Sequence, residues 1–443
     1  MIFSSIQFLI FFFIFLIFIK IFKNNQRLII ILFSIFFYSF WSPAFTFLIL
    51  FFFISSYFFL KNNLSLKISI PITLLPLFYF KYSFFLSNFF EIKMLTDLSY
   101  KGNLPLAISF ITFTAIAILV DVKTKKYNEK INFFSLSEFL IYFPQLIAGP
   151  ILRAKELIPL LKKKIIFTNE NVKFGILLFM IGFIKKIFLA DSISNFIDPI
   201  FEKENLTASE DYIKGFLLFP LQIYFDFSGY VDMALGVSKI LSIDLPINFN
   251  RPYLSSSLSE FWRNWHITLS KWFRDYIYIP LGGSRHGNKK LFGNLFITMS
   301  IAGLWHGASI NFILWGALNG IFLFFEKKIS KYFVLNRYIK IFITCFLIFN
   351  LWLVFRINDL NFLLIFYKNV YLNLLSITEI ENLLLLFSVL FAIFSQKFDN
   401  FNFIENLSKK INYLILIPIF IIILLTGLAI KAGSSQKFIY FDF

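Results

Sequence analysis

Long apolar runs recur along the whole sequence, and they constrain the fold more than any other feature. Most are close to the roughly 20 residues that a helix needs to cross the hydrocarbon core of a bilayer. Strands of a membrane barrel would instead be about ten residues long and alternate in polarity. Because backbone polar groups in lipid must be paired within their own segment, these continuous runs predict helices. The candidate runs are 2–19, 28–41, 43–60, 67–90, 104–120, 136–152, 172–190, 212–241, 291–325, 335–355, 360–376, 381–396 and 411–430.

The composition supports a polytopic membrane protein. Of the 443 residues, 58% are hydrophobic and 15% are charged, and phenylalanine alone supplies 68. A soluble domain is about a quarter charged, and a disordered chain has low hydropathy, whereas the mean hydropathy here is +0.76. We therefore expect an all-α membrane protein with about eleven transmembrane helices plus re-entrant or interfacial helices.

The formal net charge of +17 comes from 42 Lys and Arg against 25 Asp and Glu. The positive residues form short clusters between the apolar runs, which is typical of cytoplasmic loops and argues against nucleic acid as a partner. A cluster after the first run predicts an extracytoplasmic N-terminus, and Lys409 and Lys410 before the last run predict an extracytoplasmic tail. The first run also lacks the features of a cleaved signal peptide. The main clusters lie at 20–27, 123–130, 162–164 and 327–331.

The stretch 248–288 interrupts the apolar pattern with charges and three tryptophans: NFNRPYLSSSLSEFWRNWHITLSKWFRDYIYIPLGGSRHGN. One stripe at helical spacing carries Trp262, Trp265, Leu269 and Trp272. This pattern predicts an interfacial or half-buried helix. Tryptophans at headgroup level would explain the same pattern without any active site, so an amphipathic anchor stays an alternative.

Polar residues inside two apolar runs are candidates for a functional site. Asp226 and Tyr230 are four residues apart and share a helix face, and a charge at membrane depth usually faces a protein interior or a cavity. A structural hydrogen bond would explain this pair equally well. His306 lies in IAGLWHGASINFILWG between Gly303 and Gly307, which permit close helix packing. Its imidazole suits a general base near neutral pH, and a packing role is the alternative.

Other common site signatures are missing from the sequence. His266, His286 and His306 do not have the spacing of zinc ligands, so no metal site is expected. His286 falls in a glycine-rich turn and is given no catalytic role. Cys345 lies in an apolar run, which favours a buried hydrophobe over a thiol nucleophile. Neither a phosphate-binding glycine loop nor a G-x-S-x-G elbow occurs.

Four segments together carry a resemblance to a known family. They are FPQLIAGPILR (143–153), DFSGYVDMALG (226–236), the polar stretch over 248–285, and GLWHGASINFILWG (303–316). In this order they resemble the membrane-bound O-acyltransferase (MBOAT) family, in its bacterial alginate-type and peptidoglycan-type O-acetyltransferase branch. The resemblance implies a ring of transmembrane helices around a central tunnel, within one integral membrane domain over 1–443. The family core would lie at about 105–325 and the C-terminal tail at 431–443.

The resemblance also implies roles for single residues. His306 matches the invariant histidine of the family, and His266 matches a second histidine in an R-x-W-H context. Tyr440, in the terminal FIYFDF, matches a tyrosine that is proposed to carry the acyl group in the family. Asp442 departs from the usual sequence of this tail. An aromatic membrane anchor is the alternative role for the tail. The expected tunnel or supporting residues are Asp226, Tyr230, Trp305 and Asn264, and the expected acyl-donor-binding residues are Arg251, Lys271, Arg274 and Arg285.

The resemblance implies the transfer of acetyl groups from cytoplasmic acetyl-CoA, a donor substrate rather than a bound cofactor, across the bacterial cytoplasmic (inner) membrane. The acceptor would be an extracytoplasmic polysaccharide, with peptidoglycan favoured, reached through His306 and an acetyl-Tyr440 relay. Expected partners are an extracytoplasmic O-acetyltransferase or esterase-like protein, acetyl-CoA and the lipid bilayer. The alternatives are O-acetylation of alginate or another exopolysaccharide, D-alanyl transfer to teichoic acid, and a transporter or flippase, for which Asp226 and Asp232 would suit proton coupling.

Overall fold

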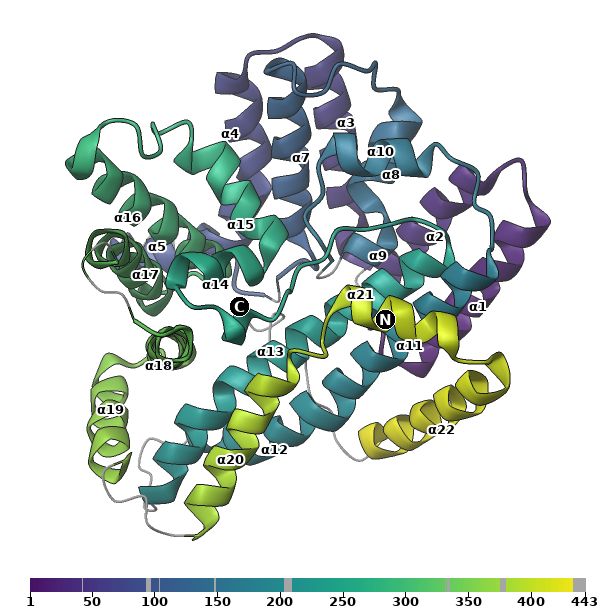
Figure 1. Cartoon of the computed structure of the whole chain (residues 1–443). Coiled ribbons are helices and arrows are strands. Elements are labelled where there is room, and N and C mark those ends of the chain that lie inside the picture. The colour runs from purple at the N-terminus through teal and green to yellow at the C-terminus, as the bar shows by residue number, and fades with distance from the viewer. Residues whose placement is uncertain are drawn as a thin grey trace. The chain divides into compact units, whose positions relative to one another are not determined.

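A computed structural model describes residues 1–41, 43–92, 97–102, 104–146, 149–202, 209–330, 332, 335–374 and 380–432. Over these residues the chain forms only helices and the loops that join them (Figure 1). The expected all-α fold is confirmed. The contacts within the chain divide it into two compact units.

The first unit consists of Met1–Ile181, Tyr230–Pro246 and Asn412–Leu428. Within it, α7 packs against α3 and α4, and these helices lie side by side in Figure 1. Two further helices, α13 (Ser209–Ile240) and α22 (Tyr413–Ala432), contribute residues to both units. The helices of the first unit are α1 (Ile6–Ile21), α2 (Gln26–Trp41), η1 (Pro43–Phe45), α3 (Thr46–Lys61), α4 (Leu66–Leu77), η2 (Phe78–Tyr82), α5 (Ser83–Phe89), α7 (Ile108–Lys123), α8 (Phe133–Ile141), α9 (Phe143–Leu146), α10 (Ala154–Leu161) and most of α11 (Asn169–Phe183).

Phenylalanine rings form much of the core of the first unit. The ring centroid of Phe143 lies 5.3 Å from those of Phe11 and Phe15 and 5.7 Å from that of Phe37. All four side chains are buried. Each such contact contributes about 0.5–1.5 kcal/mol beyond the burial of area, so aromatic packing stabilises this unit where few polar contacts are available.

The second unit consists of Gly182–Gly229, Ile247–Ile411 and the described residues that follow Leu428. In it α17 packs along α16 on one side and along α18 on another (Figure 1). Its helices are η3 (Ile184–Ala190), α12 (Asp191–Glu202), the first part of α13, η4 (Pro252–Leu254), α14 (Leu258–Asn264), α15 (Ile267–Phe273), η5 (Arg274–Tyr278), α16 (Gly287–His306), α17 (Ile310–Ile329), α18 (Arg337–Arg356), α19 (Leu360–Leu374), α20 (Ile380–Ser395) and α21 (Phe401–Lys410).

Five helices in the described part of the chain are long and apolar enough to cross a membrane. Two of the candidate runs prove to be divided: 291–325 forms α16 and α17, and 136–152 covers the end of α8 and the short α9. The total of about eleven crossings stays a prediction. The five candidate spans are Pro43–Lys61, Leu66–Phe89, Ile310–Ile329, Arg337–Arg356 and Tyr413–Lys431.

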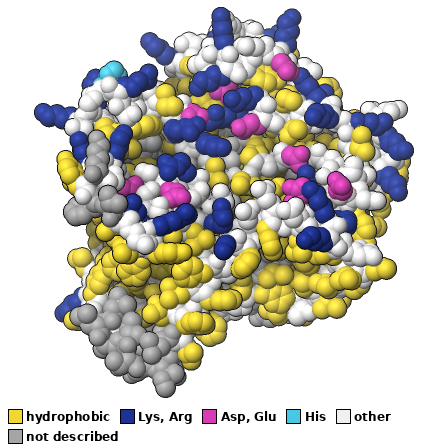
Figure 2. All heavy atoms as spheres, in the orientation of Figure 1, with side chains coloured by type: hydrophobic (Ala, Val, Ile, Leu, Met, Phe, Trp, Pro, Cys, Tyr) yellow, Lys and Arg dark blue, Asp and Glu magenta, His cyan; other side chains and the backbone are white. Residues whose placement is uncertain are grey.

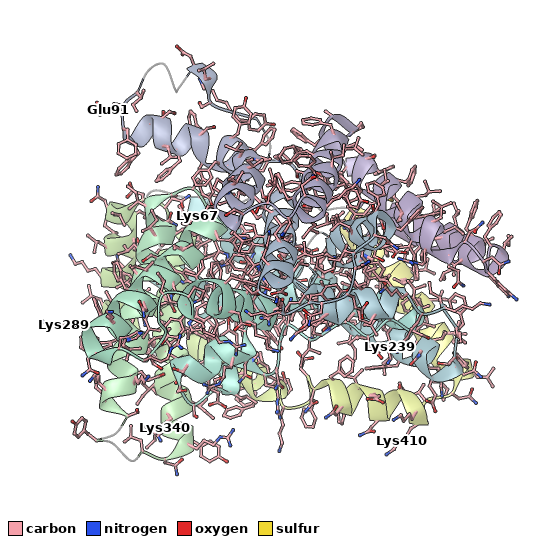
Figure 3. The ribbon with its side chains drawn as sticks, turned by 90° about the horizontal axis from the view of Figure 1, so that it is seen from above. Lys67, Glu91, Lys239, Lys289, Lys340 and Lys410 are labelled. Atoms are coloured by element: carbon pink, nitrogen blue, oxygen red, sulfur yellow. The ribbon has the colours of Figure 1, made fainter. Side chains whose placement is uncertain are left out.

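Charged side chains gather near helix ends. Lys67 and Lys340 lie in the first turns of α4 and α18, Lys239 lies in the last turn of α13, and Lys410 ends α21 (Figure 3). Lysine and arginine side chains spread widely over the face drawn in Figure 2, which also leaves many hydrophobic side chains open. Open apolar helix faces flanked by basic helix ends are typical of a protein that sits in a bilayer.

A buried ionic network joins η3, α12 and α13 within the second unit. The Lys186 ammonium lies 2.5 Å from a carboxylate oxygen of Asp226 and 2.7 Å from one of Asp191. The side chains of Lys186 and Asp226 are each 2% exposed. Because a buried charge is stable only when it is paired, the ion pair with Lys186 gives Asp226 a structural role.

Candidate active site

His306 ends α16 and reaches a cavity of about 180 Å³ in the second unit. The turn Gly307–Ser309 follows, and α17 then runs back along α16. The two helices approach so closely that only glycine fits at two positions. A Cβ atom on Gly303 would lie 2.0 Å from the carbonyl oxygen of Phe312, and one on Gly316 would lie 2.1 Å from that of Met299. These glycines allow the helical hairpin that places His306 at its tip.

Aromatic rings surround His306. Its ring centroid lies 4.9 Å from that of Trp305 and 5.2 Å from those of Trp315 and Phe355, in edge-on arrangements. Trp262 and Trp315 also line the cavity. The imidazole is 5% exposed, so the surrounding structure fixes its orientation and keeps bulk water away.

A few polar groups interrupt the apolar wall of the cavity. Arg274, Tyr278, Ser270 and Thr298 line it together with His306. The Arg274 side chain pairs with Asp275 at 2.7 Å and is 55% exposed, so it lies where the cavity opens. A mostly apolar cavity with a few convergent polar groups and one charge is typical of a site for a small organic ligand.

His266 lies in the link between α14 and α15, and not in one continuous interfacial helix. The Ser257 hydroxyl accepts a hydrogen bond from the Glu260 backbone and begins α14, whereas His266 has a left-handed φ of 41° that ends it. The prediction of a single helix through this stretch is therefore wrong. Trp265 and Trp272 are buried, which does not suit headgroup anchors.

Hydrogen bonds that Asn248 accepts hold the strained conformation of His266. The Asn248 carbonyl accepts from the Ile267 backbone at 3.0 Å, and its side-chain oxygen accepts from the Thr268 backbone at 3.1 Å and hydroxyl at 2.7 Å. A left-handed non-glycine residue costs about 1–3 kcal/mol, so these hydrogen bonds compensate for the strain at His266. Burial lowers the pKa of His266 to about 3, so this imidazole is neutral at physiological pH.

Trp305 connects the two histidines. Its ring centroid lies 6.1 Å from that of His266 and 4.9 Å from that of His306. His266 itself does not line the cavity and instead packs against Phe227, with centroids 4.7 Å apart. The geometry therefore gives His266 influence on the cavity through Trp305 rather than by direct contact.

Three other expected site residues, Asp226, Tyr230 and Asn264, are not among the residues that line this cavity. Asp226 is engaged by Lys186, and Tyr230 belongs to the first unit, where its ring stacks on Phe3 at 4.7 Å. The Asn264 amide donates to the Ser255 hydroxyl at 3.0 Å.

Of the four expected donor-binding residues, only Arg274 lines the cavity. Arg251 is half-buried, and its Nε donates to Asn250 at 3.3 Å. Lys271 and Arg285 are exposed. Tyr440 lies outside the described residues, as do all residues after 432.

The sequence did not single out Trp315, Tyr278 or Asn319 as site residues. The Trp262 indole donates to the Asn319 side-chain oxygen at 3.1 Å, and the Asn319 amide donates to the Trp315 carbonyl at 2.8 Å, so Asn319 fixes two walls of the cavity. An asparagine within the apolar run 291–325 was the available signal. Within the described residues, no group of His, Cys, Asp and Glu could hold a metal ion.

An all-helical fold with apolar candidate spans and a buried histidine at a mostly apolar cavity indicates a membrane protein with a candidate site for a small ligand. The family model for membrane-bound O-acyltransferases matches residues 27–367. The chain belongs to this family. The match confirms the resemblance carried by the four sequence segments.

Individual relatives are similar over different shares of the chain. A peptidoglycan O-acetyltransferase of Helicobacter pylori is 36% identical over 387 residues, 76% of this chain and 72% of the relative. A probable alginate O-acetylase of Pseudomonas aeruginosa is 41% identical over 261 residues, 58% of this chain and 50% of the relative. The chain thus spans about half the length of the alginate-type relatives it matches. A teichoic acid D-alanyltransferase of Bacillus subtilis is 29% identical over 245 residues, 51% of this chain and 61% of the relative.

Proposed function

We propose that this protein transfers acetyl groups from cytoplasmic acetyl-CoA across the cytoplasmic membrane for the O-acetylation of an extracytoplasmic polysaccharide, with peptidoglycan as the favoured polymer. The observation that carries the proposal is the position of the buried His306 side chain at the wall of a mostly apolar cavity. An imidazole held there is suited to act as a general base.

The reaction is acyl transfer from a thioester to a hydroxyl. The His306 imidazole takes the proton of the acceptor hydroxyl as its oxygen bonds to the thioester carbonyl carbon. The carbon–sulfur bond then breaks, and the departing CoA sulfur takes up that proton. The low polarity of the walls strengthens the electrostatic contacts of the reacting groups and limits loss of the acyl group to water.

The cavity has room for a short acyl group. Its volume of about 180 Å³ holds several water-sized groups, so the acetyl end of a thioester fits inside it. Arg274 at the opening would contact an anionic part of the donor.

The acceptor inside the membrane is proposed to be the Tyr440 hydroxyl, which would carry the acetyl group to a separate extracytoplasmic transferase. A phenol has a pKa of about 10 and needs a nearby base to attack, and His306 would supply it. The preference for peptidoglycan draws support from the Helicobacter pylori relative, which aligns over the largest share of this chain among the three relatives described above. His266 would act as a positioning residue through Trp305.

The test is CoA release by membranes that contain the protein, a transferase partner and peptidoglycan. We expect acetyl-CoA turnover by the wild type and a loss of about 100-fold or more in His306→Ala, the usual scale for a general base. His286→Ala is the matched control, because His286 is an exposed histidine before α16. Turnover independent of His306 would contradict the proposal.

The choice of donor separates the nearest alternative. The Bacillus subtilis relative is a teichoic acid D-alanyltransferase, so a D-alanyl carrier protein belongs in the same assay. Preference for that carrier over acetyl-CoA would move the proposal to D-alanyl transfer. Absence of turnover with either donor would favour a transporter.

A further inference from the structure

A second cavity, of about 640 Å³, lies in the first unit and is separate from the residues around His306. Its walls come from the last turns of α3 and α7 and from the loop that leads to α8. Two lysines, Lys61 and Lys130, and two tyrosines, Tyr57 and Tyr127, contribute to these walls. No step of the proposed acetyl transfer uses this cavity.

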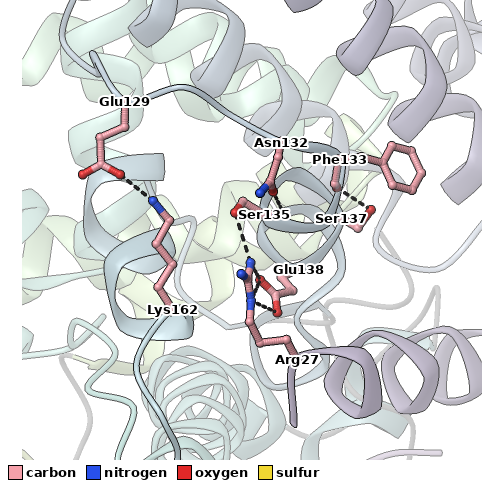
Figure 4. A network of polar contacts seen from close by, with 8 residues as sticks. All are labelled: Arg27, Glu129, Asn132, Phe133, Ser135, Ser137, Glu138 and Lys162. Atoms are coloured by element: carbon pink, nitrogen blue, oxygen red, sulfur yellow. Dashed lines mark hydrogen bonds and ion pairs between the residues drawn. The ribbon is translucent and has the colours of Figure 1, made fainter. Parts of the chain in front are cut away.

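The charge of the cavity is positive. Its acidic wall residue, Glu129, lies 2.6 Å from the Lys162 ammonium (Figure 4) and also accepts a hydrogen bond from the Tyr127 hydroxyl at 3.3 Å. Lys162 lowers the pKa of Glu129, so its negative charge is retained but compensated. Among the described residues, neither the Lys61 nor the Lys130 ammonium has an acidic partner within 4.0 Å. The cavity therefore offers two cations to an anion.

The basic residues around the cavity are of the kind expected at a membrane surface. Lys61 ends a candidate span, and Lys123 ends α7 ahead of three more lysines in the same loop. This density of basic residues between helix ends marks the cytoplasmic side. Basic pockets between helices on that side suit the headgroups of anionic phospholipids.

An open apolar face adjoins the basic wall. On α3, Phe58 is 55% exposed and Ile54 is 63% exposed, next to the wall residue Tyr57. At the start of α8, Phe133 is 47% exposed, and its ring lies edge-on to that of Tyr57 at 5.6 Å. A soluble phosphate compound would contact only the lysines, whereas the acyl chains of a lipid would also cover these side chains.

We propose that this cavity binds the phosphate of an anionic phospholipid, with the headgroup between Lys61 and Lys130 and the acyl chains along α3 and the start of α8. The tyrosine hydroxyls and the Asn128 side chain suit hydrogen bonds to glycerol and ester oxygens of the headgroup. The shared ligand chemistry is a phosphate, so the test separates a lipid from soluble phosphate compounds.

Lipid binding is measured by native mass spectrometry of the full-length protein in detergent, with phosphatidylglycerol and phosphatidylethanolamine added separately. We expect the wild type to retain phosphatidylglycerol preferentially. In Lys61→Gln/Lys130→Gln the apparent dissociation constant for phosphatidylglycerol should rise about 30-fold, the effect of losing two lysine contacts with an anionic lipid. Lys61→Arg/Lys130→Arg should retain the affinity.

The matched control is Lys289→Gln/Lys290→Gln, an exposed pair of lysines in the first turn of α16. Lys289 is labelled in Figure 3. It removes the same charge and should leave lipid retention unchanged. Unfolding temperatures of all variants show whether the protein is intact. Equal retention of the two lipids, or an equal effect of the control pair, would overturn the proposal. Displacement of the lipid by inorganic phosphate or CoA at millimolar concentration would assign the cavity to a soluble ligand instead.

Discussion

Gly303→Ala tests whether the close approach of α16 and α17 positions His306. The added Cβ would lie 2.0 Å from the Phe312 carbonyl oxygen and 3.2 Å from the Gly316 Cα. Real Cβ atoms essentially never come closer than 3.0 Å, so the two backbones must separate by about 1 Å. Backbone atoms cannot rotate away, and the strain falls on the helix that carries His306 three residues later.

The expected losses of stability and of activity follow from this displacement. Overpacking of a close-packed interior costs about 1–3 kcal/mol of unfolding free energy, which should lower the unfolding temperature by several degrees. A misplacement of about 1 Å at a catalytic group reduces the rate by roughly 100-fold. We therefore expect a protein that still folds and has lost most of its His306-dependent CoA release.

The control lies on the same helix. A Cβ on Gly293 would meet nothing within 4 Å, so Gly293→Ala should keep full activity and gain about 1 kcal/mol of helix stability. Activity is measured as CoA release from membranes, and stability as the unfolding temperature of the purified protein in detergent. Wild-type turnover in Gly303→Ala would refute the reasoning, as would equal losses in both variants.

Three further predictions concern single polar residues. Burial lowers the pKa of His266 to about 3 in the folded protein, against an ordinary value of 6.5, so between these pH values the unfolded chain binds a proton that the folded chain does not. The free energy of unfolding should therefore fall by about 1.4 kcal/mol for each pH unit of acidification. Unfolding experiments at pH 4 to 7 should show that His266→Gln removes this slope. Asp226→Asn leaves Lys186 with one carboxylate fewer and should lower the free energy of unfolding by about 3 kcal/mol. The control Asp244→Asn removes a carboxylate that is 68% exposed in its ion pair and should lower it by less than about 1 kcal/mol. Equal unfolding temperatures for the two variants would contradict this prediction. Arg274→Gln should raise KM for acetyl-CoA about tenfold, the loss of one charge-assisted hydrogen bond, with little change in kcat, and a fall in kcat alone would argue against a role in donor binding.

Hydrophobic patterning predicts most of the helices because a continuous apolar run has few alternatives in a bilayer. Hydrophobic patterning fails where a short segment of small or polar residues ends one helix and begins the next. Gly307 and the two residues after it turn the chain between α16 and α17, yet their hydropathy is too moderate to divide the run 291–325. The same turn makes His306 the end of a helix rather than the middle of a span.

Periodicity also fails where tertiary contacts override it. The stripe from Trp262 to Trp272 has helical spacing, but the left-handed residue His266 divides it because Asn248 holds that conformation from outside the segment. Local spacing carries no information on such a contact. For the same reason the sequence could name His306 and Arg274, which line the cavity, but not the Asn319 hydrogen bonds that fix Trp262 and the Trp315 backbone.

Ion pairs between residues far apart in the sequence cannot be predicted from the sequence alone. The Lys185 ammonium lies 2.6 Å from a carboxylate oxygen of Asp399, although 214 residues separate them. Asp226 was a reasonable site candidate because a carboxylate in an apolar run needs a partner. Only the fold shows that Lys186 is that partner.

The most direct test of the central claim follows an acetyl label through sealed vesicles that contain the protein, a transferase partner and peptidoglycan. Labelled acetyl-CoA is supplied only on the cytoplasmic face, and label is measured in the polymer on the other face and on the C-terminal peptide. The account predicts labelled polymer and labelled Tyr440 with the wild type and His286→Ala, and neither with His306→Ala. Label that reaches the polymer equally well with His306→Ala would contradict it.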